Sequence, residues 1–282
     1  MITFATTTLS TPALHFDDVR LSSGIRMHFA QQGPQTGPAL LLLHGFTDSW
    51  FSFSRVLPLF RPEMRVIAPD LRGHGDSTRV ATSETGTGGP AWGYRTTDLA
   101  DDVVSLMNAL RIPSAVVLGH SMGAFVARQV AAVAEARVPR LIMMGAGPSA
   151  KTPVLHALQA EVNAQSDPVD PVFVREFQES TVHQPMMPSF MEATIANSLR
   201  MPAAIWKAAL AGLIADEAPK ARLLSRTLVL GGREDKIFGP AEHISLARQF
   251  PKGELELVEG VGHAMHWENP ARFMSALVRF GV

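Results

Sequence analysis

Short apolar runs alternate with longer helical patterns along most of this chain, and this alternation constrains the fold more than any other feature. The runs are four or five residues long and mostly lack polar alternation, which is typical of strands buried on both faces of a sheet. They cover residues 39–43, 65–68, 115–118, 141–144, 227–230 and 254–258. Helices are expected between and after them, over residues 49–60, 97–110, 122–134, 240–249 and 270–280. The alternation predicts a three-layer α/β fold around a mostly parallel sheet.

Two shorter segments stand outside this alternation. Residues 14–21 and 25–31 have the composition of strands on either side of a Ser-Gly turn, so we expect the sheet to begin with an antiparallel hairpin. Residues 82–93 are rich in glycine and threonine and indicate a flexible loop. Such a loop is either a surface connection or part of the rim of an active site.

A longer segment, residues 148–219, separates the fourth apolar run from the fifth. It is too long for a loop and has helical patterns throughout, so we expect a helical cap inserted into a core formed by residues 1–147 and 220–282. Its large apolar side chains are Phe173, Phe177, Met186, Met187, Phe190, Met191, Met201 and Trp206. Most of these should form the core of the cap itself. Some should face the main domain, because a cap must bury a surface against it.

Composition excludes several classes of protein. Hydrophobic residues make up 46% of the 282 residues and charged residues 18%, which is typical of a globular chain that buries a large core. The formal net charge of −1 gives no reason to expect nucleic acid or an anionic membrane as a partner. No cysteine is present, which excludes thiolate catalysis and fits a reducing, cytoplasmic location. We expect neither a signal peptide in residues 1–12 nor a membrane span.

A candidate nucleophile lies where one apolar run meets a predicted helix. The sequence Gly-His-Ser-Met-Gly at residues 119–123 follows the run at 115–118 and has the pattern G-x-S-x-G. A sharp strand-to-helix turn strains the serine backbone and exposes its hydroxyl above the sheet, while the two glycines relieve crowding across the turn. The following helix directs its N-terminus at the reacting centre, where negative charge develops. We therefore expect Ser121 to be the nucleophile.

A serine hydroxyl needs a base, and the base needs an orienting carboxylate. His263 is the expected base, because it follows the last apolar run and two glycines that permit a tight loop. His266, nearer the final helix, is the competing candidate. Asp235 is the expected carboxylate, because it follows the run at 227–230 and precedes the histidine in the chain. Its neighbour Glu234 should point elsewhere, towards solvent or an adjacent arginine.

Acyl transfer also requires two backbone N–H groups near the developing oxyanion. One should come from Met122, directly after the nucleophile. The other should come from Phe46, in the turn that follows the apolar run at 39–43. In this arrangement the Phe46 side chain forms a wall of the substrate pocket or part of the core.

Taken together, these motifs resemble those of the α/β-hydrolase superfamily, in particular its capped esterase, lactonase and epoxide-hydrolase-like branch. The resemblance covers most of the core and rests on HGFTDSW at 44–50, PDLRGHGDS at 69–77, GHSMG at 119–123, GRED at 232–235, and GH at 262–263 with Glu268 and Pro270. It implies a Ser121, Asp235 and His263 triad, with Phe46 and Met122 as oxyanion donors. It also implies that residues 69–77 form a structural loop, so Asp70 and His74 are not expected to act in catalysis.

One departure from that branch limits the expected chemistry. The segment at residues 44–50 resembles that of epoxide hydrolases and dehalogenases, but these families have an aspartate as the nucleophile in the turn. Ser121 stands there in this chain. A serine forms an acyl-enzyme rather than an alkyl-enzyme ester, so neither of those reactions is expected.

The leading prediction is hydrolysis of a carboxylic ester or lactone, with no metal or organic cofactor required. The apolar cap suggests a hydrophobic small-molecule substrate bound between sheet and cap, with Phe and Met side chains as an adaptable wall. Hydrolysis of a carbon–carbon bond in a β-diketone-like substrate by the same triad is the alternative. A catalytically inactive fold that binds a small ligand is a third reading, although no triad member is missing. The oligomeric state and the natural substrate are left open.

Overall fold

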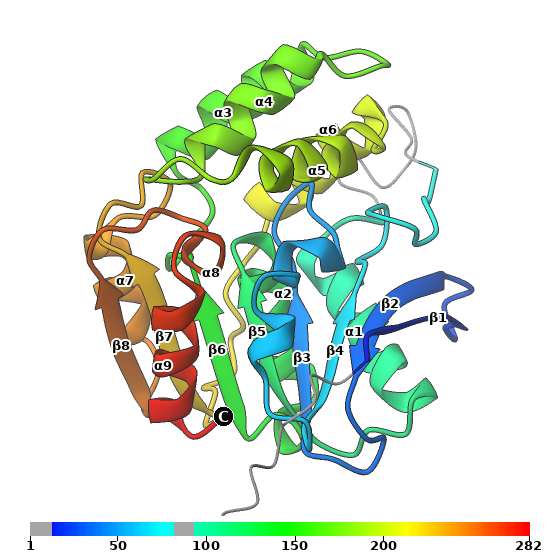
Figure 1. Cartoon of the computed structure of the whole chain (residues 1–282), viewed down its shortest axis with the longest axis vertical. Helices are drawn as coiled ribbons and strands as arrows, with labels where there is room; N and C mark the ends of the chain where they lie inside the picture. The colour runs from blue at the N-terminus through cyan, green and yellow to red at the C-terminus, as the bar shows by residue number, and fades with distance from the viewer. Residues whose placement is uncertain (1–12, 82–92) are drawn as a thin grey trace, which may run out of the picture.

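A single sheet of eight strands runs through the described part of this computed structural model, residues 13–81 and 93–282 (Figure 1). Its strands lie in the order β1-β2-β4-β3-β5-β6-β7-β8. They are β1 His15–Arg20, β2 Arg26–Gln32, β3 Ala39–Leu43, β4 Arg65–Pro69, β5 Ala115–His120, β6 Arg140–Met144, β7 Arg226–Gly232 and β8 Gly253–Val258. β2 pairs antiparallel with both β1 and β4, and all other pairs are parallel. The N-terminal hairpin and the mostly parallel sheet are confirmed. The expected loop at 82–93 lies, except for Gly93, outside the described residues.

Helices follow the strands as the alternation predicts. In the same described ranges they are α1 Thr96–Ala109, α2 Met122–Val133, α3 Pro153–Asn163, α4 Pro171–Ser180, α5 Pro188–Leu199, α6 Ala203–Ile214, α7 Pro240–Ala247, α8 Met265–Glu268 and α9 Pro270–Phe280. Short 3₁₀ turns are η1 Trp50–Phe53, η2 Leu57–Leu59 and η3 Glu135–Arg137. Proline is the first residue of α3, α4, α5, α7 and α9, where its fixed φ suits a helix and its missing N–H would have had no helical partner.

The predicted helix over residues 49–60 is wrong, because this segment forms the two turns η1 and η2 instead. The Oδ1 atom of Asp70 accepts the Trp50 N–H at 2.7 Å, so a residue from a distant part of the chain fixes the start of η1. Pro58 lies inside η2 and supplies no N–H with which a longer helix could continue. The apolar residues of the segment are buried as expected, but the backbone satisfies its hydrogen bonds in a different way.

The apolar character of the central strands, such as β3, follows from their burial on both faces. Leu41 and Leu43 of β3 belong to the core cluster that also contains residues of α1 and α2. Leu40 and Leu42 belong to the opposite cluster, which contains residues of η1 and α9. All four leucines are fully buried. A strand covered on both faces cannot alternate polar with apolar residues, and this explains the runs seen in the sequence.

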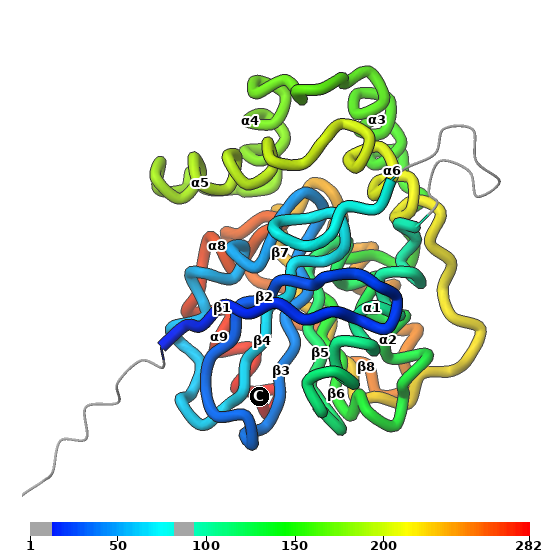
Figure 2. The backbone as a smooth tube through the Cα atoms, turned by 90° about the vertical axis from the view of Figure 1, so that its right-hand side faces the viewer, coloured from blue at the N-terminus to red at the C-terminus, as the bar shows by residue number. Residues whose placement is uncertain are grey.

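Residues 148–219 contain the four helices α3 to α6, and we call this segment the cap. It connects β6 to β7 and lies over the carboxyl ends of the parallel strands (Figures 1 and 2). Within it, α3 packs on α6 and α4 packs on α5. The expected helical insertion is confirmed. Its division from residues 1–147 and 220–282 as a separate domain stays a prediction.

The strand order brings the predicted functional residues to one edge of the sheet. Phe46 follows β3, Ser121 follows β5, Asp235 follows β7 and His263 follows β8. The carboxyl ends of parallel strands all lie at the same edge, which is where open α/β sheets bind their ligands. The cap covers this edge, so the site lies between the two.

Candidate active site

Ser121 occupies a sharp turn between β5 and α2 and has φ 52° with ψ −120°. A positive φ is uncommon for a residue other than glycine and stores backbone strain. The Ser121 N–H donates to the Met144 carbonyl at 2.8 Å, so the neighbouring strand β6 helps to hold the turn. A serine in such a turn projects its hydroxyl beyond the end of the sheet.

The two glycines of the turn are required by close backbone approaches. A Cβ atom at Gly119 would lie 2.0 Å from the Gly123 carbonyl oxygen. This contact agrees with the prediction that the two residues crowd each other across the turn. A Cβ atom at Gly123 would lie 2.2 Å from the Leu43 carbonyl oxygen. The second glycine is therefore needed for a further reason, which is the close packing of α2 against the end of β3.

Phe46 and Met122, the predicted oxyanion donors, belong to two turns that lie close to Ser121. Met122 is the first residue of α2, so its N–H has no acceptor within the helix. Phe46 lies in the turn after β3, and a Cβ atom at the preceding Gly45 would lie 3.4 Å from Cβ of Ser121. The N-terminus of α2 also favours negative charge here. The arrangement is compatible with an oxyanion hole of two backbone N–H groups, whose role stays a prediction.

Asp235 and His263 form a buried hydrogen-bonded pair. Nδ1 of His263 lies 2.9 Å from Oδ2 of Asp235. The other carboxylate oxygen accepts the N–H groups of Ile237 at 2.8 Å and Phe238 at 3.0 Å. Burial alone would raise the pKa of Asp235, but the charge of His263 and the hydrogen bonds that the carboxylate accepts hold the pKa well below its usual range. The carboxylate is therefore ionised and fixed in position beside the imidazole.

The two competing residues have other partners. Nε2 of His266 lies 3.0 Å from the Ser52 hydroxyl oxygen, and burial holds the pKa of His266 well below its usual value. Glu234 accepts the N–H groups of Gly260 at 2.9 Å and Val261 at 3.2 Å, rather than pointing freely to solvent or an arginine. Glu234 thus shapes the loop that leads to the candidate base, and neither residue replaces a member of the predicted triad.

Sequence reasoning missed His243, a second imidazole beside the carboxylate. Its Nδ1 lies 2.8 Å from the Ala146 carbonyl oxygen, and its Nε2 lies 3.6 Å from Oδ2 of Asp235. The side chain is fully buried in α7 against the end of β7. A Cβ atom at Gly231 would lie 2.1 Å from the ring, so this glycine makes room for the histidine. The sequence offers one signal of this contact, which is the pair of glycines, Gly231 and Gly232, at the end of β7.

Ser121 and His263 line the same cavity, which has a volume of about 30 Å³ between the sheet and the cap. A cavity needs a volume of roughly 10–15 Å³ to hold one water molecule, so this one has room for about two waters or a small acyl group. Its apolar wall is formed mainly by Leu155, Leu158, Phe177, Leu210, Leu213, Ile237 and Trp267. Phe46 also lines the cavity, in agreement with its expected place in a pocket wall.

The cavity wall differs from the expected one in its residue types. The cap contributes leucines and Phe177, and none of its methionines lines this cavity in the described structure. Met186 and Met191 instead line a separate groove on the cap surface, between α4 and α5. The wall is apolar as predicted, but branched leucines give it a more defined shape than flexible methionines would.

Asp48 adds an unexpected acidic group to this cavity. It is buried, and its Oδ2 atom accepts a hydrogen bond from the Ser52 hydroxyl at 3.2 Å. Burial raises the pKa of Asp48 to about 7. His120 is another polar residue at the cavity, and its Nε2 atom lies 3.1 Å from the His263 carbonyl oxygen. Burial lowers the pKa of His120 to about 3. Near neutral pH the cavity therefore holds a neutral imidazole and a carboxyl group that is partly protonated.

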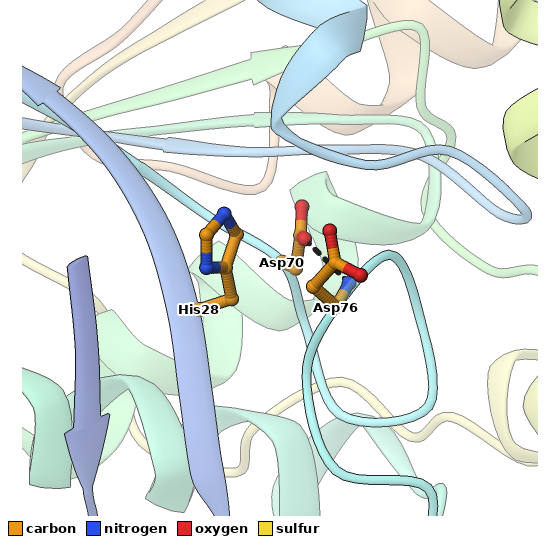
Figure 3. Close-up of side chains that lie close together, drawn as sticks. All are labelled: His28, Asp70 and Asp76. Carbon is orange, nitrogen blue, oxygen red and sulfur yellow. Dashed lines mark hydrogen bonds between the residues drawn. The ribbon is translucent and has the colours of Figure 1, made fainter. Parts of the chain in front are cut away.

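A separate group of ionisable side chains lies away from this cavity. His28, Asp70 and Asp76 lie close enough together to hold a cation (Figure 3). The Asp70 oxygens accept the Trp50 N–H at 2.7 Å and the Asp76 N–H at 2.8 Å, and Asp76 also pairs with Arg200 of the cap. These bonds hold the loop at residues 69–77 in place, so the group has a structural role, as the resemblance implies for Asp70.

Comparisons with known proteins identify the family. A model described as the alpha/beta hydrolase fold matches residues 38–270. The chain therefore belongs to the α/β-hydrolase fold family. Within the described ranges no helix combines the length and apolar character needed to cross a bilayer.

Individual relatives differ in the activity that their names state. The 2-hydroxymuconate semialdehyde hydrolase of Pseudomonas sp. (strain CF600) is 29% identical over 275 residues, which cover 92% of each chain. Epoxide hydrolase 4 of Mus musculus is 33% identical over 122 residues, but the match spans 43% of this chain and only 32% of that relative. A thermophilic esterase from Thermogutta terrifontis has a similar structure, with a TM-score of 0.78, 25% identity, and coverage of 94% of this chain and 97% of the esterase. The relatives thus agree on a hydrolase and differ on the bond that is cleaved.

Proposed function

We propose that this protein is a serine hydrolase that cleaves a carboxylic ester or lactone through an acyl-enzyme on Ser121. The observation that carries the proposal is the strained backbone of Ser121 at the same cavity as His263, whose Nδ1 is hydrogen-bonded to a buried carboxylate. A nucleophile, a base and an orienting group are the three parts that this chemistry requires. The similarity to the thermophilic esterase supports the same reading.

Each step uses a group at this site. The Ser121 hydroxyl oxygen attacks the carbonyl carbon while Nε2 of His263 accepts the hydroxyl proton. The N–H groups of Phe46 and Met122 stabilise the negative charge on the carbonyl oxygen. The protonated His263 then donates its proton to the leaving alcohol. Water, activated by the same imidazole, cleaves the acyl-enzyme and releases the acid.

The cavity supports a small and largely apolar acyl group. Its walls are leucines and aromatic rings, and its volume is about 30 Å³. A cavity of this size favours a short acyl chain over a long one. Short esters and small lactones are therefore the proposed substrate class.

Ester turnover tests this proposal directly. The purified protein should hydrolyse p-nitrophenyl acetate and butyrate, and Ser121→Ala should abolish the reaction. Ser275→Ala is a matched control, because Ser275 lies exposed on α9 far along the chain from the turn. No turnover of any short ester or lactone by the parent protein would contradict the proposal and leave carbon–carbon bond hydrolysis or a ligand-binding fold without activity.

Hydrolysis of a carbon–carbon bond is the second candidate, and two observations favour it. The relative that matches along 92% of both chains is named for 2-hydroxymuconate semialdehyde, a compound without an ester bond. A carbon leaving group must also gain a proton, and Asp48 at the cavity has a pKa near 7 from which one could come. Measuring kcat/KM for that semialdehyde and for p-nitrophenyl acetate separates the two candidates. A higher kcat/KM for the semialdehyde supports the second candidate, and Asp48→Asn should then lower turnover of the semialdehyde more than turnover of the ester.

A further inference from the structure

The backbone turn that would supply one oxyanion donor is strained. The Asp48 N–H donates to the Gly45 carbonyl at 3.3 Å, which closes a turn with Phe46 and Thr47 at its two central positions. Thr47 has φ 65°. Turns with a positive φ at the third position normally place glycine or asparagine there, and a β-branched residue is an outlier. Something outside the turn must therefore hold Thr47 in this conformation.

Two cap side chains contact Thr47 by hydrogen bonds. Nε2 of Gln178, on α4 and at the cavity wall, donates to Oγ1 of Thr47 at 3.1 Å and to the Ser198 hydroxyl oxygen at 2.9 Å, and it lies 3.5 Å from Oδ1 of Asp48. The Ser198 hydroxyl, on α5, lies 3.3 Å from both the carbonyl oxygen and Oγ1 of Thr47 and 3.2 Å from the Thr194 carbonyl oxygen of its own helix, so its one proton is shared among these acceptors. Thr47, Gln178 and Ser198 are almost fully buried, with exposures of 2% or less. In the absence of competing water such bonds fix the geometry of a turn closely.

The cap also packs against Phe46, the residue that precedes Thr47 in the turn. The Phe46 ring lies edge-on to Phe177 of α4, with ring centroids 5.8 Å apart, and edge-on to Trp206 of α6 at 5.3 Å. Aromatic pairs at these distances and angles are attractive. The side chains of both central residues of the turn are thus held by the cap, one by aromatic packing and the other by hydrogen bonds.

We infer that Gln178 and Ser198 are positioning residues for the oxyanion hole: by holding Thr47 in its left-handed conformation they aim the Phe46 N–H at the substrate oxygen. We call these two residues with Thr47 the clamp. The inference rests on the proposed function, since it assigns the clamp to the same ester hydrolysis. It also gives the cap a part in the chemical step, in addition to its part in enclosing the substrate.

The clamp should act on the transition state more than on the bound substrate. A donor to the oxyanion contributes mainly once the carbonyl oxygen carries charge, and removal of one donor costs about 10²–10³-fold in kcat. Loss of the clamp leaves the N–H present but less well aimed. A smaller loss of about 10-fold in kcat is therefore expected, with KM changed by less than about threefold.

The test uses the full-length protein and three clamp variants, Gln178→Met, Ser198→Ala and Thr47→Gly. Gln178→Met keeps the length of the side chain but removes the donor, and it should lower kcat for p-nitrophenyl acetate about 10-fold. A trifluoromethyl ketone provides the second readout. Ser121 adds to its carbonyl carbon, the proton passes to His263, and the carbonyl oxygen becomes an oxyanion. Its inhibition constant should rise by the same factor as kcat falls, whereas a neutral product alcohol should bind as before.

Thr47→Gly separates positioning from a general loss of packing. Glycine adopts φ 65° without strain, so the turn no longer needs the clamp. In the Thr47→Gly background, Gln178→Met should then lower kcat by less than about twofold. A double-mutant cycle should therefore show strong coupling between the two substitutions. Thr194→Val on α5 is the matched control, because its hydroxyl donates to the Phe190 carbonyl within the helix and does not contact the turn.

Three results would overturn the inference. Gln178→Met and Ser198→Ala could leave kcat and ketone binding unchanged, they could raise only KM, or their effects could add independently to that of Thr47→Gly. Thermal melting of each variant shows whether it is folded. If Gln178→Met is unfolded, Ser198→Ala, the smallest change, provides the test instead. A parent protein that neither hydrolyses esters nor binds the ketone contradicts the proposed function and the clamp together. An active parent with unaffected variants contradicts the clamp alone.

Discussion

Oδ2 of Asp235 lies 2.9 Å from Nδ1 of His263, and both side chains are buried. Because the carboxylate can only accept this bond, Nδ1 carries the proton and the lone pair of the neutral ring is on Nε2. The N–H groups of Ile237 and Phe238 hold the carboxylate from its other oxygen. The pair therefore fixes the tautomer that a serine nucleophile requires, and it does so before any substrate binds.

Asp235→Asn should disable the base without unfolding the protein. The amide is nearly the same size as the carboxylate, but it can present N–H to Nδ1 and so favours the wrong tautomer. A loss of about 10⁴-fold in kcat is expected. Steady-state hydrolysis of p-nitrophenyl acetate measures it, with Glu259→Gln as a matched control, because the Glu259 side chain is 82% exposed. Retention of more than a tenth of the parent kcat would argue against Asp235 as the orienting group.

His263 and His266 should respond differently to substitution. His263→Ala should lower kcat/KM by about 10²–10⁴-fold, because the general base is lost. His266→Phe should leave kcat/KM within a few fold of the parent, because Nε2 of His266 contacts only Ser52 and its ring lies among buried aromatic side chains such as Phe53. The lost hydrogen bond, worth about 1 kcal/mol, should instead lower Tm by a few degrees. Equal losses of activity in both variants would contradict the assignment.

Asp48 should make stability depend on pH in the direction opposite to most carboxylates. Burial raises its pKa in the folded protein from 3.8 to about 7, so between these values the folded state binds one proton more than the unfolded state. Its contribution to stability is fully present below pH 3.8 and is lost as pH rises through about 7. The slope for one such proton is about 1.4 kcal/mol per pH unit.

Asp48→Asn removes this titration, so the variant should gain stability relative to the parent as pH rises. Urea unfolding at pH 5 and pH 7 should show the difference in unfolding free energy between variant and parent shifting by roughly 2 kcal/mol in favour of the variant. Parallel stability curves for the two proteins over this range would mean that Asp48 titrates at its ordinary value.

Leu158→Ala should change the preference for acyl length. Leu158, on α3, lines the cavity and is partly exposed, so shortening it enlarges the acyl space at moderate cost to stability. The ratio of kcat/KM for p-nitrophenyl hexanoate over acetate should rise by about 10-fold, since each buried methylene contributes about 0.8 kcal/mol. Leu224→Ala serves as the control, because Leu224 is exposed outside the cavity. An unchanged ratio would mean that the acyl group binds elsewhere.

Local patterns were sufficient for the sheet and for the positions of the predicted triad residues. Each apolar run became a strand, and the central ones are covered on both faces, whereas the edge strand β8 is largely exposed. Ser121, Asp235 and His263 each follow one of these strands. Parallel strands bring their carboxyl ends together, so chain order and turn glycines were enough to group these residues.

Contacts between distant segments could not be predicted in the same way. The helix expected over residues 49–60 failed because the carboxylate of Asp70 fixes the start of η1. Gln178 and Ser198 have no local pattern that distinguishes them from other polar residues of a helix. Their partner Thr47 is more than a hundred residues away in the chain. The raised pKa of Asp48 also depends on burial that only the assembled cap and core produce.

Covalent labelling of Ser121 tests the central claim most directly. A fluorophosphonate reacts preferentially with a serine that a base has activated, which displaces fluoride, and it places a polarised phosphoryl oxygen in the oxyanion hole. Intact-mass measurement should show one added phosphonyl group, peptide mapping should locate it on Ser121, and Ser121→Ala should stay unlabelled. Asp235→Asn should label far more slowly than the parent protein. An unlabelled parent, or a label on another residue that persists in Ser121→Ala, would contradict a serine hydrolase built on this turn.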